Sequence, residues 1–302
     1  MFKNDGTIAV LTSGGDAPGM NAAIRAVVRT AYARGIEVLG VRRGYTGLIN
    51  GDFIELGIQD VSSLTSQGGT YLYTARSPEF MSAEGQDRAA SACKYRGVKA
   101  VIVIGGDGSF RGCIELSKRG LATIGIPATI DNDIACTNYT IGFDTAANTA
   151  IEAIDKLNDT MRSHERCSVV EVMGRNAGHL AVYVGIATGA CSVIVPERPF
   201  DFDSDISERI RRGKLNGRNH FIVIVAEGTG ITNEVAARIE RETGIATRVT
   251  ILGHVQRGGR PSARDRVTAS RMGKHAVELL SNGKRNRLVG IINGTMHDFD
   301  IG

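Results

Sequence analysis

The sequence predicts an α/β fold with two doubly wound domains, each built on a mostly parallel sheet. Short apolar runs, typical of buried strands, alternate along the chain with amphipathic segments at helical spacing. Strands and helices that alternate in this way form parallel sheets covered by helices on both faces. The chain has 302 residues, which suggests two domains at roughly 150 residues each. Its 42% hydrophobic and 23% charged content is that of a globular protein and argues against a disordered chain.

Continuous apolar runs justify the strands, and apolar residues that recur every three or four positions justify the helices. In chain order, the predicted strands are residues 7–12, 37–42, 100–104, 122–126, 168–172, 192–195, 221–226 and 247–252. The predicted helices are residues 21–34, 84–96, 109–118, 145–160, 177–188, 203–212, 233–243 and 263–282. Binding sites in parallel α/β folds lie at the carboxyl ends of strands, so we expect the functional residues there.

Charge and cysteine usage exclude several classes of protein. The net charge is +4 and the longest basic clusters are pairs such as Arg42-Arg43, which predicts no surface for nucleic acid or membrane. No stretch approaches the roughly 20 apolar residues of a membrane span, and the run at residues 8–11 is too short for a signal peptide. An odd number of cysteines without a CxxC pair indicates buried free thiols rather than disulfides or a zinc site. These features favour the reducing cytoplasm. The cysteines are Cys93, Cys113, Cys136, Cys167 and Cys191.

Three predicted strand ends carry unusual sequences, at residues 13–19, 105–109 and 129–133. In the first two, small residues would expose backbone N–H groups at a helix N-terminus, where an anion such as phosphate is favoured. Neither has the Gly-Lys-Ser/Thr of a P-loop or the GxGxxG of a dinucleotide fold. Glycine turns after strands are common, so each loop alone is a weak signal, but the 38 glycines exceed a typical content by roughly 17.

The aspartates in these loops have two readings. Asp16 and Asp107 could cap helices, and Asp131 and Asp133 could stabilise a turn. Two carboxylates at i and i+2 beside two anion-binding loops also suit phosphoryl transfer, which needs one acid for magnesium and one to accept the nucleophile's proton. From the residues alone, both readings remain open.

Arginine and histidine side chains recur next to glycine further along the chain. A lone arginine is usually a solvated surface residue, whereas an arginine at a strand end beside glycine can bind phosphate through two charge-assisted hydrogen bonds. The segments concerned are Thr74-Ala75-Arg76, His164-Glu165-Arg166, Met173-Gly174-Arg175-Asn176, Arg248, and Gly253-His254-Val255-Gln256-Arg257-Gly258-Gly259.

Taken in order, six segments resemble the successive motifs of the bacterial ATP-dependent 6-phosphofructokinase family. They are SGGDAPGMNAAIR, GGTYLYTAR, VIGGDGS, TIDND, EVMGRNAG and LGHVQRGG, and the match extends over about residues 7–297. NAD kinases and lipid kinases share Gly-Gly-Asp-Gly but have no reason to contain TIDND or the arginine set, and a dehydrogenase would need GxGxxG. The resemblance implies a larger ATP-binding domain over residues 1–142 and 256–302, and a smaller fructose 6-phosphate domain over 143–255.

The resemblance implies glycolytic transfer of the γ-phosphoryl of MgATP to the 1-hydroxyl of fructose 6-phosphate, giving fructose 1,6-bisphosphate and ADP. Asp131 matches the general base, Arg76 and Thr129 match groups that stabilise charge on the phosphoryl, and Gly15 matches the γ-phosphate cradle. Asp107 matches the magnesium ligand, with Asp133 acting through water. The implied ATP ligands are Gly15, Tyr45, Arg76, Ser77, Gly106, Asp107, Gly108, Ser109 and Gly112. The implied sugar ligands are Thr129, Asp131, Asp133, Arg166, Met173, Gly174, Arg175, Glu227, Arg248, His254 and Arg257.

In this family Arg166 and Arg248 reach the neighbouring subunit's site, which implies a homotetramer. Two positions bear on the phosphoryl donor, because diphosphate-dependent relatives typically carry Asp and Lys where this chain has Gly108 and Ala128. Both favour ATP, although Ala128 departs from the usual glycine. The alternatives are a diphosphate-dependent enzyme and a catalytically silent paralogue; the latter would be expected to lose Asp131 or Arg76, and both are present.

The family's effector site, which takes ADP or phosphoenolpyruvate, is only partly matched. Arg25, Arg29, Arg218 and His220 match retained members of the site. Ile58, Asn158, Cys191 and Asn216 stand where the pattern has Arg, Arg, Glu and Lys. Three lost cations at about 1 kcal/mol each would weaken anion binding over a hundredfold. We therefore expect weak or absent effector regulation, unless the match slips by a residue near Ile58 or Arg211, Arg212 or Lys214 compensates.

Overall fold

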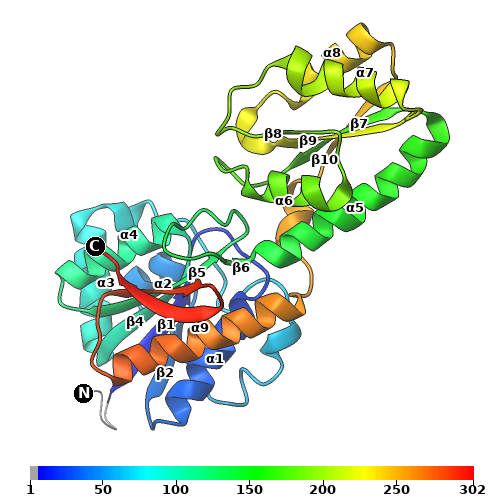
Figure 1. Cartoon of the computed structure of the whole chain (residues 1–302). Coiled ribbons are helices and arrows are strands. Elements are labelled where there is room, and N and C mark those ends of the chain that lie inside the picture. Colours follow the sequence, from blue (N-terminus) through cyan, green and yellow to red (C-terminus); the bar gives the residue numbers. More distant parts are fainter. Residues whose placement is uncertain (1–5) are drawn as a thin grey trace. The chain divides into compact units, whose positions relative to one another are not determined.

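The computed structural model describes residues 6–302, and the chain divides into two compact units (Figure 1). Unit 1 combines Met1–Thr129, Ile134–Asp144 and Arg257–Gly302, and unit 2 combines Ile130–Asp133 and Thr145–Gln256. The chain therefore leaves unit 1 and returns to it for its last segment. Which ligand each unit binds stays a prediction at this point.

The sheet of unit 1 is parallel at its centre and antiparallel at both edges. Strands β1 (Thr7–Thr12), β4 (Val98–Gly105) and β5 (Ala122–Thr129) pair parallel, with β4 between the other two. The complete order is β12 (Thr295–Asp300), β11 (Arg287–Ile292), β5, β4, β1, β2 (Glu37–Val41) and β3 (Phe53–Glu55), with β6 (Ile141–Gly142) paired to β5. Only β3 and β12, at the two ends, run antiparallel to their neighbours.

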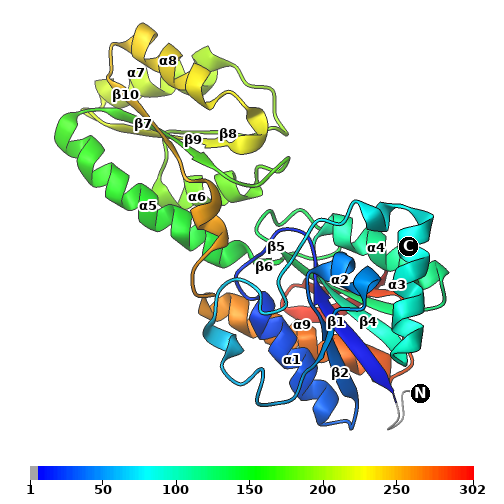
Figure 2. The ribbon, with the colours of Figure 1, turned by 180° about the vertical axis from the view of Figure 1, so that it is seen from behind.

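Both faces of this sheet are covered, which explains why its central strands are apolar without interruption. Ile8, Ala9, Val10 and Leu11 of β1 are all fully buried. Helices α1 (Met20–Tyr32) and α9 (Ala263–Ser281) lie side by side on one face (Figures 1 and 2). The other face is covered by α2 (Gly44–Asn50), α3 (Ala83–Tyr95) and α4 (Asp107–Lys118).

Unit 2 is built on a smaller sheet whose strands are all parallel. The order is β10 (Thr247–Ile251), β7 (Cys167–Val172), β9 (Phe221–Ala226) and β8 (Ser192–Ile194). Helices α7 (Glu208–Leu215) and α8 (Thr232–Thr243) pack on one face, where Ile206, Ile210 and Ile239 are buried. Helices α5 (Phe143–His164) and α6 (His179–Thr188) lie on the other face.

The predicted α/β class with mostly parallel sheets is confirmed, and the predicted strands and helices are all present with small differences at their ends. The strand predicted to end at residue 126 continues to Thr129, because Pro127 still pairs with Gly105 of β4. The helix predicted over residues 203–212 begins with a π-helical turn, Asp203–Ser207. Five elements were not predicted. α2, β3, β6 and β12 are short, rich in glycine or polar at alternate positions, whereas β11 is an apolar and mostly buried strand.

Two further expectations concern membranes and thiols. Across residues 6–302, the structure contains no helix both long enough and apolar enough to cross a bilayer. All five cysteines carry free thiols. Cys93, Cys113 and Cys167 are buried as predicted, whereas Cys136 and Cys191 are partly exposed.

Candidate active site

Three of the loops identified in the sequence leave the same edge of the first sheet. β1, β4 and β5 are adjacent and parallel, so their carboxyl ends meet at one edge. β1 leads into residues 13–19, β4 into residues 105–109, and β5 ends at Thr129. This sheet edge therefore gathers both glycine-rich loops and the start of the TIDND motif.

Residues 13–19, which we call the phosphate loop, present a helix N-terminus that is not capped by a side chain. Ser13 N–H donates to Ile104 O at 3.0 Å and ties the loop to β4. The N-cap of α1 is Gly19, with φ 107°, and within the described chain its end receives no side-chain cap and has no acidic residue in its first turn. Met20 N–H donates to Ala17 O at 3.2 Å, and a helix N-terminus without a side-chain cap favours an anion near its remaining N–H groups.

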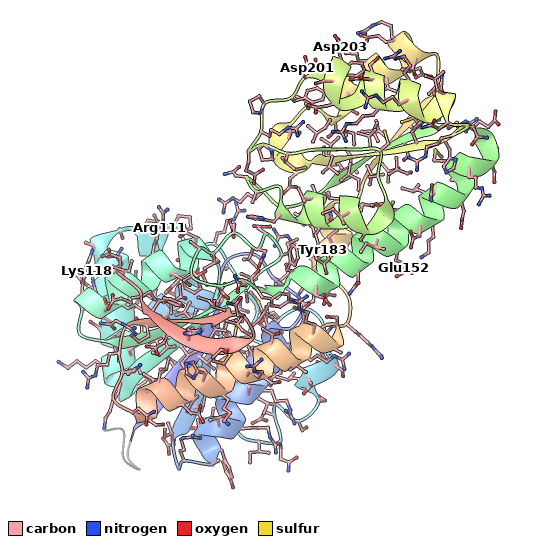
Figure 3. The ribbon with its side chains drawn as sticks, viewed as in Figure 1. Arg111, Lys118, Glu152, Tyr183, Asp201 and Asp203 are labelled. Atoms are coloured by element: carbon pink, nitrogen blue, oxygen red, sulfur yellow. The ribbon has the colours of Figure 1, made fainter. Side chains whose placement is uncertain are left out.

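The loop after β4 has similar properties and is tightly packed against the first. A Cβ at Gly105 would lie 2.6 Å from Ser13 O and 2.5 Å from Ser109 Oγ, so only glycine fits there. Gly106 is the N-cap of α4 and Asp107 is its first residue. The helix-capping reading of Asp16 and Asp107 is therefore wrong, because the caps are Gly19 and Gly106. Asp107 Oδ2 instead pairs with Arg111 Nη2 at 3.1 Å, and Figure 3 shows Arg111 on the exposed side of α4.

Tyr45 packs against the first turns of α4 and donates a hydrogen bond to them. Its side chain is 4% exposed, its hydroxyl donates to Ser109 O at 2.5 Å, and its ring stacks on Phe80 with centroids 4.1 Å apart. A Cβ on Gly112 would overlap the Tyr45 ring, which explains the glycine on this face of α4. Burial raises the pKa of Tyr45 well above its usual value, so the phenol stays protonated. A contact between Tyr45 and a nucleotide stays a prediction.

Arg76 lies in a loop that contacts the phosphate loop directly. Thr74, two residues before it, donates from Oγ1 to Gly14 O at 2.7 Å. The Arg76 side chain is exposed, and Ser77 Oγ is buried with no hydrogen-bond partner among the described residues. Arg76 and Ser77 are therefore placed close, along the chain, to the anion-binding backbone of the phosphate loop.

Arg257 also reaches the phosphate loop. Its Nη1 donates to Asp16 O at 3.2 Å. Its guanidinium occupies the place that a Cβ on Gly15 would take, so any larger residue at position 15 would displace it. An arginine from the GHVQRGG segment and the first glycine-rich loop therefore meet within unit 1.

The TIDND segment continues from β5 into a tight turn. Thr140 Oγ1 donates to Thr129 O at 2.6 Å, and Asn132 takes a positive φ of 51°. Asp131 is 7% exposed, whereas the side chain of Asp133 is exposed. The structure thus gives the two carboxylates of this motif different environments.

In unit 2, several of the predicted sugar ligands gather at the carboxyl edge of the second sheet. Arg175 N–H, after β7, donates to Glu227 Oε1, after β9, at 2.7 Å. Met173 N–H donates to Gln256 Oε1 at 3.4 Å, which links the end of β7 to the GHVQRGG segment after β10. Gly174 takes φ 135°, a conformation that favours glycine. His254 lies in the 3₁₀ turn that follows β10 at this same edge.

Arg166 and Arg248 lie at the opposite edge of this sheet. Arg166 immediately precedes β7, and Arg248 near the start of β10 pairs in register with Ser168. Since each strand residue adds about 3.3 Å, the backbone positions of Arg166 and Met173 are separated by about 23 Å along β7. Within one copy of unit 2, the two arginines therefore do not join Met173, Arg175 and Glu227.

The predicted effector residues lie in both units. Arg25 and Arg29 are on α1 in unit 1, and the Nε of Arg25 is buried without a partner within the described part of the chain. Arg218 and His220 precede β9 in unit 2. Burial raises the pKa of Cys191, while Arg218 and Arg209 partly oppose that rise, so this thiol occupies a partly buried site next to cations.

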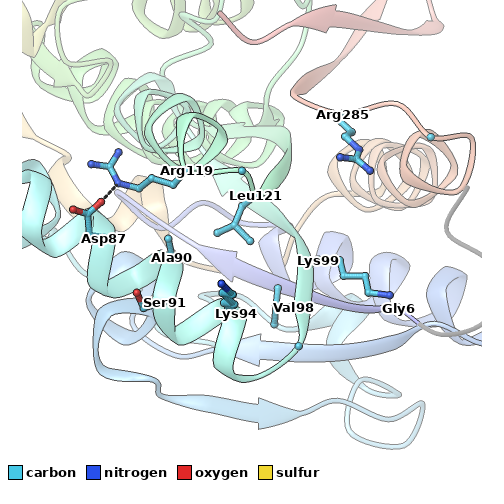
Figure 4. Close-up of a pocket in the computed structure, with 13 residues that line it drawn as sticks. Gly6, Asp87, Ala90, Ser91, Lys94, Val98, Lys99, Arg119, Leu121 and Arg285 are labelled. Carbon is cyan, nitrogen blue, oxygen red and sulfur yellow. Dashed lines mark hydrogen bonds and ion pairs between the residues drawn. The ribbon is translucent and has the colours of Figure 1, made fainter.

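A cavity of unit 1 lies away from all these residues. It has a volume of about 880 Å³ and contains Lys94, Lys99 and Arg285, with Arg119 paired to Asp87 at 2.6 Å (Figure 4). It is at the amino ends of the strands, where α3, α4 and α9 end. Cations at helix C-termini offset the negative end of the helix dipole, which accounts for the basic lining.

Two buried polar side chains with clear positions in the site were not among the predicted residues. Gln256 is fully buried and accepts from Met173, and Asn21 is 2% exposed at the start of α1. Both residues belong to motifs noted in the sequence. A polar residue within an otherwise apolar stretch was the signal that could have marked them as buried supports of the site. Their role as supports depends on contacts far apart in sequence, which no local pattern reveals.

Comparisons with known proteins identify the family to which this chain is similar. Residues 7–280 match the phosphofructokinase family. A protein of Clostridium botulinum named ATP-dependent 6-phosphofructokinase is 57% identical over 98% of this chain and 92% of its own length. One of the same name from Clostridium tetani is 58% identical over 97% of this chain and 92% of its own length.

Solved structures of the family have the same fold. Phosphofructokinase from Saccharomyces cerevisiae superposes with a TM-score of 0.92 at 37% identity, over 98% of this chain but 45% of its own length. That from Pichia pastoris gives 0.94 at 38% identity, over 100% of this chain and 35% of its own length. This chain thus spans less than half of either yeast chain. A pyrophosphate-dependent phosphofructokinase from Marinobacter aquaeolei, 21% identical over 98% of this chain and 83% of its own, shares the fold with a TM-score of 0.89. The chain belongs to the phosphofructokinase family.

Proposed function

We propose that this protein transfers the γ-phosphoryl group of ATP to the 1-hydroxyl of fructose 6-phosphate, in glycolysis. The observation that carries the proposal is the 57% identity, over 98% of the chain, to a relative named ATP-dependent 6-phosphofructokinase. The geometry supports it, because the two glycine-rich loops and the loop of Arg76 belong to one sheet edge and expose the anion-binding groups that a nucleotide needs.

ATP rather than diphosphate is the proposed donor. A Cβ on Gly108 would meet nothing within 4 Å, so the space above the first turn of α4 is open. An aspartate there would project its charge into the position proposed for the nucleotide phosphates. Ala128 is 1% exposed and pairs with Ile141, so its methyl group packs inside the protein.

In the proposed mechanism, Asp131 accepts the proton of the attacking 1-hydroxyl as that oxygen bonds to the γ-phosphorus, while the bond from the γ-phosphorus to the oxygen that bridges it to the β-phosphate breaks and ADP leaves. Arg76 and the hydroxyl of Thr129 stabilise negative charge on the transferring phosphoryl group, and the backbone N–H at Gly15 cradles it. Asp131 is largely shielded from water, which suits a base that must act on the sugar rather than on solvent.

The carboxylates fit a magnesium ion held jointly with the nucleotide. Within residues 6–302, no three His, Cys, Asp or Glu side chains form a cluster that could hold a metal alone. Mg²⁺ needs only one or two carboxylates, since phosphate oxygens and waters complete its six ligands. Asp107 would hold it directly and Asp133 through water, as both are exposed hard oxygen donors. The ion would supply positive charge that neutralises the phosphates.

For the sugar phosphate, we propose that Met173, Gly174, Arg175 and Glu227 surround the sugar while His254 and Arg257 bind its 6-phosphate. Arg166 and Arg248 would serve the site of a second copy, because they lie at the other edge of the second sheet. The protein would then act as an oligomer with shared sites, and a homotetramer is the assembly we propose. The free thiols support a reducing location, the cytoplasm.

A coupled assay with fructose 6-phosphate and either ATP or diphosphate tests the proposal. We expect turnover with ATP and none with diphosphate. Replacing the general base in Asp131→Ser should lower kcat by about 10²–10⁴-fold with MgATP binding retained. Turnover with diphosphate alone would indicate the diphosphate-dependent reaction, and no turnover with either donor would indicate a silent paralogue.

A further inference from the structure

The segment that carries Arg76 has no regular secondary structure to hold it. It runs between the 3₁₀ turns Leu64–Ser66 and Glu79–Met81, and we call residues 67–76 the arginine loop. Backbone groups outside helices and sheets need other partners to be fixed in place. The contacts of this loop therefore decide where Arg76 can be.

Asn21, the second residue of α1, holds the first half of the arginine loop. Its Nδ2 donates to Gln67 O at 3.2 Å and to Gly68 O at 3.1 Å, and its Oδ1 accepts from Tyr71 N–H at 2.6 Å. The side chain is 2% exposed. Both ends of the amide are thus bonded to loop backbone, which requires a donor and an acceptor in one short side chain.

Three threonine hydroxyls hold the second half, together with Arg43 N–H, which donates to Leu72 O at 2.8 Å. Thr12, the last residue of β1, donates from Oγ1 to Tyr73 O at 2.8 Å, and its hydroxyl lies 2.8 Å from that of Thr70. Thr74 Oγ1 donates to Gly14 O at 2.7 Å. The arginine loop is therefore bonded to the end of β1, to the phosphate loop and to the start of α1.

We propose that Asn21 is a positioning residue that fixes Arg76 relative to the phosphate loop. The inference rests on the proposed function, in which Arg76 stabilises charge on the phosphoryl group that Gly15 cradles. Asn21 and Gly15 belong to one continuous strand-loop-helix segment, so bonds from Asn21 to the arginine loop fix the loop in the frame of that cradle. A displacement of about 1 Å at a charge-stabilising group can cost about 10²-fold in rate.

The decisive variant is Asn21→Leu, which keeps the shape of the side chain and removes all three hydrogen bonds. We expect kcat to fall about 10²-fold while KM for ATP and for fructose 6-phosphate changes little, because the loss concerns charge that develops during transfer. Asn21→Asp keeps the acceptor for Tyr71 N–H but turns a carboxylate oxygen toward the carbonyls of Gln67 and Gly68, so it should be no faster than Asn21→Leu.

A double-mutant cycle with Arg76→Ala separates positioning from general stability. If Asn21 acts through Arg76, the double variant should be no slower than Arg76→Ala alone. Losses that multiply would overturn the proposal, and so would an Asn21→Leu enzyme with wild-type kcat. If the wild type itself shows no activity with ATP and fructose 6-phosphate, the proposed function fails instead.

Thr74 supplies a second route should Asn21→Leu fail to fold. Thr74→Val removes the bond to Gly14 O at nearly constant volume and should also lower kcat, whereas Thr74→Ser keeps the hydroxyl and should restore it. Thr123→Val is the matched control, since Thr123 is a fully buried threonine of β5 whose hydroxyl donates to Cys113 O at 3.4 Å, away from both loops. It should lower Tm and leave kcat unchanged; equal losses of kcat in Thr123→Val and Thr74→Val would overturn the proposal.

Discussion

At the scale of single residues, burial separates side chains that face a ligand from those that support one. Tyr45 and Asp107 both belong to the predicted nucleotide site, yet Tyr45 is 4% exposed and bonded to Ser109 O. The Asp107 side chain is 62% exposed and pairs with Arg111, a surface arginine. Residue type alone does not distinguish these roles. The sequence shows that both residues belong to motifs, but it does not show how deeply each side chain is buried.

The thiols give a prediction at this scale. Burial raises the pKa of Cys93, Cys113 and Cys167 to about 12, so at pH 8 they are protonated as well as shielded. We expect an aromatic disulfide reagent at pH 8 to modify Cys136 and Cys191 first, as these are partly exposed. Peptide mapping by mass spectrometry would check the order. All five should react in denaturant, and rapid native modification of Cys113 would contradict the prediction.

At the scale of elements, the two edge strands that the sequence did not predict, β3 and β12, are exposed or half-buried, whereas β11 is apolar and mostly buried. β12 pairs antiparallel with β11 at the sheet edge, and its residues are mostly exposed or half-buried. An edge strand needs little apolar sequence, because one side of its backbone and part of its faces stay in water. The central strands β1, β4 and β9 were visible because both of their faces are covered.

An ion-pair network closes this edge hairpin and makes it sensitive to acid. Asp298 of β12 accepts from Lys284 Nζ at 2.8 Å and from Arg287 Nε at 2.8 Å. Burial opposes its ionisation, but the bonds from Lys284 and Arg287 outweigh burial and lower the pKa of Asp298. A lowered pKa in the folded state adds stability above the unfolded value near 3.9, and that stability is lost as pH falls through the folded pKa.

We therefore expect Asp298→Asn to lower the free energy of unfolding by about 1–2 kcal/mol at pH 7. The difference from wild type should shrink below about pH 4, where Asp298 becomes protonated in the unfolded chain and then in the folded one. Urea unfolding between pH 7 and pH 2 measures this. Asp300→Asn is the control, since Asp300 is 73% exposed and pairs with Arg287 at 3.3 Å; it should cost less than about 0.5 kcal/mol.

At the scale of the whole molecule, the direction of the second sheet has a consequence for assembly. Arg166 and Arg248 lie at its amino edge, whereas Met173 and Arg175 follow its carboxyl edge. If all four serve the sugar phosphate, each site must use residues from two copies of the chain. Such sharing makes activity a property of the oligomer.

Mixing two inactive variants tests this sharing. Asp131→Ser lacks the proposed base and Arg166→Ala lacks the proposed partner arginine, so each oligomer alone should be nearly inactive. After co-refolding in equal amounts, random association should rebuild about a quarter of the sites. Recovery near that level supports shared sites, and mixed oligomers without recovered activity would show that Arg166 serves its own chain.

The proposed weak regulation also concerns the assembled molecule. Position 58 is isoleucine, and positions 158 and 216 are asparagine, where the family pattern has cations. We expect ADP or phosphoenolpyruvate at about 1 mM to leave the fructose 6-phosphate saturation curve nearly unchanged, because weak anion binding shifts an equilibrium little. Initial rates with and without effector measure this, and a large shift of the curve would show that other residues such as Arg211 compensate.

The sequence by itself determined the family, the order of the motifs and the central strands, because these depend on local periodicity and on short segments of unusual composition. Even the meeting of the two glycine-rich loops was expected, since the carboxyl ends of parallel strands share an edge. The tertiary structure decided the pairing order of β11, β5, β4 and β1 and the burial of Tyr45. It also decided that Gly19 and Gly106, rather than aspartates, are the N-cap residues of α1 and α4, and that Asn21 bonds to the arginine loop. These depend on contacts between residues far apart in the chain, such as Arg257 with Asp16, 241 positions apart, and no pattern within a single segment encodes them.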